Sequence, residues 1–147
     1  MPAHRPRSDE RGATLVEFAL VLLPFLLLLF GLLDLGRGVY TYNASAQAAR
    51  EIARVTSVHP FDACCALGTS TEANAVKTQQ KRVVPGLNDA GIVVECVDVL
   101  DAAIPADDCS PGDYIRVTVS TTFRPVTPLL GQLGPYTLRS ISHVQRP

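Results

Sequence analysis

Glu17 is the one ionisable residue in a nearly unbroken apolar run from Ala13 to Leu33, and Gly12 stands directly before that run. A charge inside a membrane-spanning segment costs about 3 kcal/mol on insertion scales, so a lone carboxylate there indicates a function. If a peptidase cuts after Gly12, Ala13 gains a free amine one helical turn from Glu17, on the same helix face. The amine and the carboxylate can then neutralise each other, within one chain or between neighbours. In an uncleaved chain, Glu17 lies only one turn inside the run and reaches the membrane surface itself.

Residues 13–33 have the length of a transmembrane helix. About twenty apolar residues cross a ~30 Å hydrocarbon core at ~1.5 Å per residue. Arg5, Arg7 and Arg11 precede the run, which predicts a cytoplasmic N-terminus and an outward-facing remainder. A cleaved secretory signal would need small residues directly after the run, but the nearest Ala-x-Ala stands at 44–46. We therefore expect a single-pass protein of the cytoplasmic membrane with a cytoplasmic N-terminus and an extracytoplasmic C-terminal domain.

The helical pattern continues beyond the predicted membrane segment, over residues 34–58. One face of this continuation gathers Ala46, Ala49, Ile52 and Ala53. Such a face allows close packing, either against a partner subunit or against the chain's own domain. Pro24 is expected to kink the long helix, because a proline inside a helix removes a hydrogen bond. Pro60 is expected to end it, because the residue before a proline avoids the helical conformation.

The remainder predicts a small domain of α+β class, with a short helix over 71–84 and an antiparallel sheet of about three strands. The strand-like segments are 91–100, 113–123 and 136–144. The second of these alternates well and places Ile115, Val117, Val119 and Phe123 on one side, where the emerging helix would bury them. The expected organisation is a cytoplasmic leader at 1–12, a transmembrane helix at 13–33, its continuation at 34–59 and an external domain at 60–147.

All four cysteines follow the predicted membrane segment: Cys64, Cys65, Cys96 and Cys109. An even number of cysteines in an oxidising compartment indicates two disulfides. Neighbouring cysteines bridge each other only through a strained peptide, so we expect Cys64 and Cys65 to pair elsewhere. Two pairings remain, 64–96 with 65–109 or 64–109 with 65–96. A zinc site is the alternative, but no C-x-x-C motif is present and the histidines have no recognisable ligand spacing.

The start of the long helix resembles a known family. Residues 11–22 read Arg-Gly-Ala-Thr-Leu-Val-Glu-Phe-Ala-Leu-Val-Leu, and Pro24 follows. This run is similar to the N-terminal signature of TadE-like proteins, which are pseudopilins of the tight-adherence (Flp pilus) machinery of bacteria and relatives of type IV pilins. The segments Gly36-Arg37 and 48–54 also resemble the family's helix continuation. The likeness is specific over about 11–54 and looser toward the C-terminus.

The resemblance implies that a prepilin peptidase cuts between Gly12 and Ala13, and that Glu17 is the glutamate such substrates carry. Phe18 occupies the place where the major Flp pilin usually has tyrosine, which favours a minor pseudopilin over the main filament subunit. The implied partners are the prepilin peptidase, other pilins and pseudopilins, the pilus assembly platform and the lipid bilayer. The alternative is an uncleaved single-pass anchor whose external domain is an envelope binding module.

Other function classes find no support in the residues. Thirteen basic and fourteen acidic side chains are spread thinly, whereas a nucleic-acid partner usually requires a basic patch. There is no nucleophile-elbow serine and no phosphate-binding glycine loop. We therefore expect no enzymatic activity, no cofactor or metal, and no small-molecule substrate.

Overall fold

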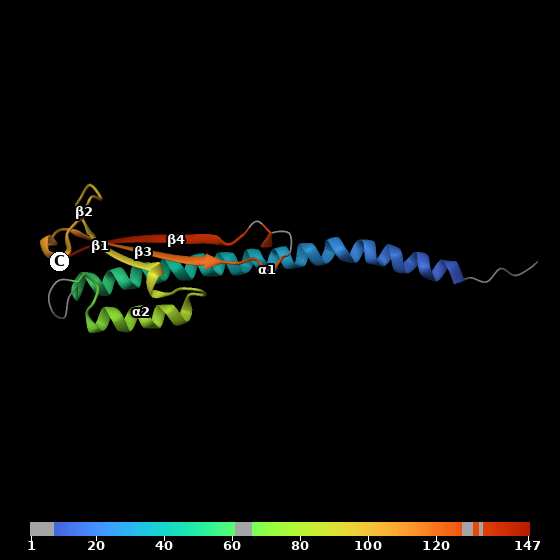
Figure 1. The fold of residues 1–147 in the computed structure, drawn as a ribbon, viewed down its shortest axis with the longest axis horizontal. Coiled ribbons are helices and arrows are strands. Elements are labelled where there is room, and N and C mark those ends of the chain that lie inside the picture. The colour runs from blue at the N-terminus through green and yellow to red at the C-terminus, as the bar shows by residue number, and fades with distance from the viewer. Residues whose placement is uncertain (1–7, 61–65, 128–130, 133) are drawn as a thin grey trace, which may run out of the picture.

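The computed structural model describes residues 8–60, 66–127, 131–132 and 134–147. The chain forms an elongated molecule in which one helix, α1 (Ser8–Val58), runs through most of the length (Figure 1). The sheet and a second helix, α2 (Thr71–Val83), lie along the C-terminal half of α1, and the N-terminal half projects alone (Figure 1). The predicted α+β class, with its long first helix, short second helix and antiparallel sheet, is confirmed.

Helix α1 is continuous from the apolar run into the folded domain. Pro24 lies inside it, and Figure 1 shows a shallow bend in the N-terminal half rather than a break. The helix ends at Val58, where the amide of His59 still donates to the carbonyl of Val55 over 2.9 Å. Pro60 thus ends the helix where the sequence predicts, because the residue before a proline avoids the helical conformation.

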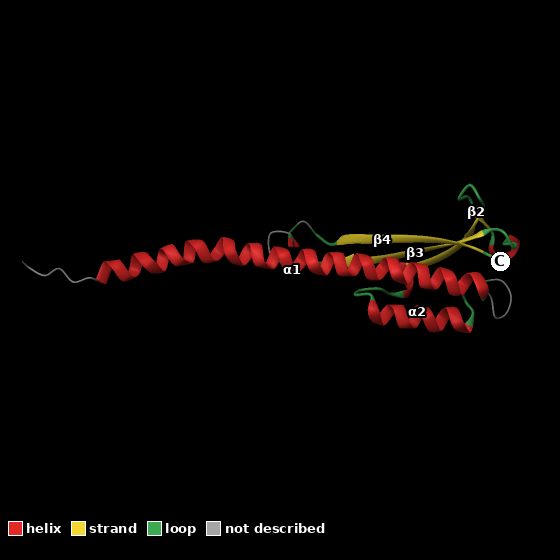
Figure 2. Cartoon of the chain, turned by 180° about the vertical axis from the view of Figure 1, so that it is seen from behind, coloured by secondary structure: helices red, strands yellow, loops and turns green. Residues whose placement is uncertain are grey.

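Helix α2 begins at a side-chain cap. The hydroxyl of Ser70 accepts a hydrogen bond from the amide of Ala73 at 3.1 Å, which satisfies one of the free N–H groups at the helix start. The helix ends one residue before the predicted boundary, ahead of Pro85 and Gly86. It lies along α1 on a different side from the sheet (Figure 2).

The sheet has four antiparallel strands in the order β2-β1-β3-β4. Their bounds are β1 (Ile92–Val97), β2 (Ala103–Ile104), β3 (Tyr114–Phe123) and β4 (Tyr136–Gln145). The three predicted strands are present, and the fourth, β2, has only two residues and so shows no alternation that could predict it. Two 3-10 turns, η1 (Asp89–Gly91) and η2 (Ala106–Asp108), flank β1 and β2.

The core lies between the alanine-rich face of α1 and the inner face of the sheet. Ala49, Ile52 and Ala53 are fully buried, and so are Ile115 and Val117 of β3. Alanines let the helix approach the strands closely, so that branched side chains fill the space between them. The sequence predicts that this helix face packs either against a partner subunit or against the chain's own domain. The structure shows the latter, because the sheet covers the face.

One disulfide joins Cys96 and Cys109, so both pairings expected from the sequence are wrong. Cys96 lies at the end of β1 opposite Ile104 of β2, and the chain needs only the short η2 turn to bring Cys109 back. Neither the two-residue strand β2 nor the η2 turn has a sequence pattern that predicts this tight return. Cys64 and Cys65 lie outside the described residues.

The disulfide lies next to the carboxylate of Asp113. Cys96, Cys109 and Asp113 form the one grouping of potential metal ligands within the described parts of the chain. Because the two sulfurs are bonded to each other, they offer no thiolate to a metal ion. The carboxylate of Asp113 instead accepts a hydrogen bond from the amide of Ser110 at 2.8 Å. This grouping therefore holds a loop together.

Candidate assembly surface along the first helix

The residues singled out at the start of the apolar run all lie within α1. Gly12, Ala13, Glu17 and Phe18 are exposed on the projecting half of the helix. Ala13 and Glu17 are four residues apart in a continuous helix and so share a face. The peptide bond between Gly12 and Ala13 also lies inside the helix, because α1 begins at Ser8. A peptidase that cuts there has to open the first turns of α1.

The projecting half of α1 is apolar on every side. Leu15, Leu20 and Leu28 each leave more than 60% of their surface exposed, and no part of the most apolar window is buried by the rest of the fold. Within the described residues, α1 is the one helix long and apolar enough to cross a membrane. A helix apolar all round is covered either by protein or by lipid, which is consistent with a single-pass membrane anchor.

Asp34, directly after the apolar run, joins α1 to the segment that follows β3. Its carboxylate accepts hydrogen bonds from the amide of Val126 at 2.9 Å, and from the amide and hydroxyl of Thr127 at 2.7 and 2.6 Å. The guanidinium of Arg37 adds an ion pair at 3.2 Å. Asp34 is only 3% exposed, so these groups replace water around the charge.

These contacts keep Asp34 ionised. They lower its pKa from 3.8 to about 2, and the largest contribution is the hydrogen bond from the Thr127 hydroxyl, followed by the amides of Val126 and Thr127. Arg37 lowers the pKa further, while burial of the carboxylate raises it. Hydrogen bonds to a buried carboxylate are strong and directional. Asp34 therefore fixes the position of the segment after β3 relative to α1.

This role of Asp34 could not be predicted from its place in the sequence, directly after the apolar run. Two of its donors are backbone amides, which carry no signature in the sequence, and both lie more than ninety residues away along the chain. One feature of the sequence does indicate that Asp34 has a partner: it is a carboxylate at the boundary of a membrane-length apolar run, where a charge needs one. Arg37, three residues away on the same helix, and Thr127 provide the two side-chain partners.

Beside this junction, an apolar groove of about 790 Å³ lies between α1 and the end of the sheet where β3 ends and β4 begins. The helix side of the groove includes Leu28, Gly31, Leu35, Gly38 and Tyr42, and the sheet side includes Phe123, Pro125, Tyr136 and Leu138. Glycines on the helix side keep the groove open. A Cβ atom at Gly31 would meet no atom of the described residues within 4 Å, so within that part of the chain the groove is open at this point.

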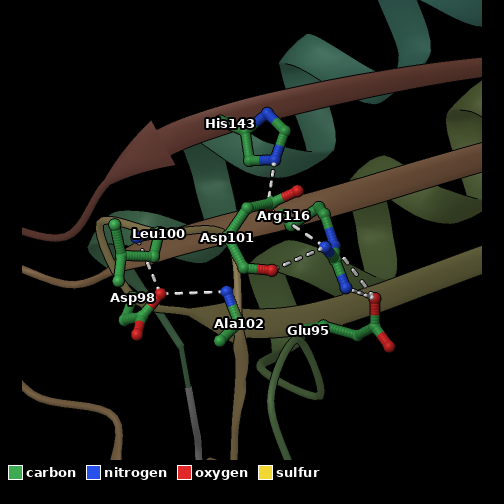
Figure 3. Close-up of polar contacts among 7 residues, drawn as sticks. All are labelled: Glu95, Asp98, Leu100, Asp101, Ala102, Arg116 and His143. Carbon is green, nitrogen blue, oxygen red and sulfur yellow. Dashed lines mark hydrogen bonds and ion pairs between the residues drawn. The ribbon is translucent and has the colours of Figure 1, made fainter.

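A polar cluster occupies the other face of the sheet (Figure 3). Asp101 lies between Arg116 and His143, and its carboxylate is 3.0 Å from a nitrogen of each. Arg116 also pairs with Glu95 at 2.9 Å. The hydrogen bond from His143, and then the charge of Arg116, lower the pKa of Asp101.

This cluster has a structural explanation. Asp101 is the one non-glycine residue with a positive φ in the described backbone, at 65°, and Asp98 caps the same turn by accepting from the amides of Leu100 and Ala102 at 2.8 and 2.9 Å (Figure 3). Asparagine and aspartate tolerate this conformation better than most residues. The ion pairs thus hold the β1–β2 turn in place, and we assign no chemistry to them.

Comparison with protein families finds one match in this chain, to the family model described as TadE-like protein, over residues 12–54. Comparisons with curated proteins and with solved structures find no match. The matched segment begins at Gly12 and contains Glu17, Pro24 and Asp34. It ends within the part of α1 that packs against the sheet. The likeness read from residues 11–54 is confirmed, and the N-terminal segment of this chain, from Gly12 to Arg54, is TadE-like.

Proposed function

We propose that this chain is a minor pseudopilin, a membrane-anchored assembly protein for a Flp-type (tight adherence) pilus or a related secretion apparatus. The observation that carries the proposal is the TadE-like match over residues 12–54, because it covers the helix that bears Glu17 and continues into the fold. The family associates the chain with the Tad pilus and with other pilus components. Since assembly proteins of this kind act by packing, the proposal requires no catalytic group.

The proposed first step is cleavage by a prepilin peptidase after Gly12, on the cytoplasmic side of the inner membrane. The leader 1–12 then leaves, and Ala13 becomes the first residue of the mature chain. Gly12 supports this step physically. Glycine inside a helix costs about 1 kcal/mol relative to alanine, and a Cβ here would meet nothing within 4 Å. The peptide is thus accessible and its local helix is easily opened.

The proposed second step is helix packing in the membrane. Glu17 would pair with the new amine of Ala13, in the same chain or in a neighbouring subunit, and would set the register between helices. Residues 13–33 span the bilayer and 34–59 continue the helix outward. The external domain at 60–147 then presents its partner-specific contacts in the periplasm.

Replacing Glu17 with alanine is expected to reduce the number of assembled pili about tenfold or more, because an unpaired buried amine is strongly destabilising. The measurement is a count of surface pili in cells that carry the variant in place of the native chain. Leu20→Ala is the matched control. Leu20 lies on the same part of α1, is exposed like the residues around it, and carries no charge. Membrane levels of both variants are measured by immunoblot.

Pilus numbers that stay unchanged in Glu17→Ala would contradict the proposed pairing. A loss of pili in Leu20→Ala equal to that in Glu17→Ala would contradict it as well, because general helix packing would then explain both results.

A further inference from the structure

The apolar groove lies at the level where the proposed membrane span ends. Its helix side runs from Leu28 to Tyr42, which is about 21 Å of helix axis at ~1.5 Å per residue. Leu28, Gly31 and Leu32 lie within the 13–33 span, and the other helix residues that line the groove lie beyond it. The groove therefore extends from the outer leaflet into the headgroup layer. This placement rests on the membrane orientation in the proposed function.

Two arginines flank the groove. An adjacent pocket is lined in part by Arg37, Tyr40 and Arg124, and it shares Phe123 with the groove. The guanidinium of Arg37 lies 5.7 Å from the centre of the Phe123 ring, a distance that allows a cation–π contact. Arg124 is exposed. Basic groups thus stand beside the apolar wall.

The charge at this place is positive overall. Asp34 is the one carboxylate among the residues that line either pocket, and its oxygens already accept from Val126 and Thr127. Arg37 is 55% exposed at its side chain despite its pair with Asp34. The two guanidinium groups can therefore contact a further anion from the side of the membrane surface.

We propose that the groove and its two arginines bind an anionic phospholipid of the outer leaflet. One acyl chain lies along the apolar wall over Gly31, and the phosphate contacts Arg37 and Arg124. Guanidinium groups suit this role because their fork of donors matches phosphate oxygens. Exposed tyrosines at the same level, Tyr40 and Tyr42, are typical of the membrane interface.

The helix of a second copy fits the groove less well. The apolar run 13–33 of α1 carries one acid, Glu17, which in a parallel neighbour lies about 16 Å below Leu28 along the helix axis. A packed helix would therefore cover the apolar wall and bring no anion to Arg124 or to the exposed part of Arg37, whose one ion pair is with Asp34 of its own chain. A lipid provides the apolar chain and the anion in one molecule, at the depth where both are needed.

The test uses the full-length chain in nanodiscs that contain phosphatidylglycerol and phosphatidylcholine with identical acyl chains. Native mass spectrometry after release measures which lipid stays bound. We expect the native chain to retain phosphatidylglycerol about tenfold over phosphatidylcholine, and Arg124→Gln to bring this ratio below about threefold. Gly31→Leu, which places a side chain in the groove at a position where a Cβ meets no described atom within 4 Å, is expected to lower the retention of both lipids at unchanged helix content.

Arg50→Gln is the matched control, because Arg50 is an exposed arginine of α1 about 24 Å beyond Asp34 along the helix axis. It should keep the native ratio. Equal retention of the two lipids by the native chain would overturn the lipid site, as would native behaviour of both Arg124→Gln and Gly31→Leu. A chain that fails to enter nanodiscs would overturn the membrane placement and the lipid site together, whereas a chain that enters them without lipid preference overturns the lipid site alone.

Discussion

Asp34→Ala is expected to lower the melting temperature of the external domain by about 10 °C or more. The change leaves the buried amide and hydroxyl of Thr127 and the amide of Val126 without their acceptor. Each unsatisfied buried donor is costly, and a domain of this size is sensitive to such losses. The measurement is thermal unfolding of the full-length chain in detergent, followed by circular dichroism.

Hydrogen exchange gives a local readout for the same variant. The amides of Val126 and Thr127 should exchange much faster in Asp34→Ala, because their acceptor is gone. Asp107→Ala is the matched control, since Asp107 is an exposed carboxylate in η2, and it should change neither the melting temperature nor these amides. Native protection at Val126 and Thr127 in Asp34→Ala would show that Asp34 does not hold the segment.

The pKa of Asp34 predicts a pH window for this contribution. Folding lowers the pKa to about 2 from a usual value of 3.8, so the folded state favours the ionised carboxylate. The stabilisation is fully present above pH 3.8 or so, and is lost as the pH falls toward 2. Over that interval the native chain should lose stability more steeply than Asp34→Asn, whose side chain does not titrate.

Replacing both Cys96 and Cys109 with alanine is expected to reduce the free energy of unfolding by about 3 kcal/mol. The disulfide closes a short loop, with a separation of 13 residues, and in the chain-entropy model a loop of that size stabilises the fold by roughly this amount. Both cysteines are buried, so the loss of packing adds to the effect. Chemical denaturation of the full-length chain in detergent measures the difference.

Peptide mapping under non-reducing conditions tests the pairing itself. A digest should yield one disulfide-linked species that contains Cys96 and Cys109, and this species should persist in a chain with Cys64→Ser and Cys65→Ser. Linkage of Cys96 to Cys64 or Cys65 would contradict the pairing and restore the expectation from sequence.

Local patterns in the sequence predict most of the secondary structure. The alternation of Ile115, Val117 and Val119 predicts β3 and its buried face, because side chains of a strand alternate between two sides. The spacing of Ala49, Ile52 and Ala53 likewise predicts the face of α1 that the sheet covers. Pro60 predicts the helix end. Each of these features depends on neighbours a few residues away.

The features that could not be predicted depend on contacts between distant parts of the chain. Asp34 meets backbone amides of Val126 and Thr127, and amides look alike in every sequence. The disulfide between Cys96 and Cys109 follows from the two-residue strand β2, which is too short to show a pattern. The groove arises only when β4 and the segment after β3 lie beside α1. The residues that form these three features are not neighbours in the sequence and come together only in the folded chain.

The N-terminal mass of the membrane-bound chain tests the central claim most directly. The proposed function predicts that, in cells with an active prepilin peptidase, the chain begins at Ala13, and that in cells without the peptidase it retains residues 1–12. A Gly12→Leu variant should keep the leader in both strains, because a bulky residue replaces the accessible glycine. Intact residues 1–12 on the native chain in the presence of an active peptidase would contradict the assignment as a processed pseudopilin.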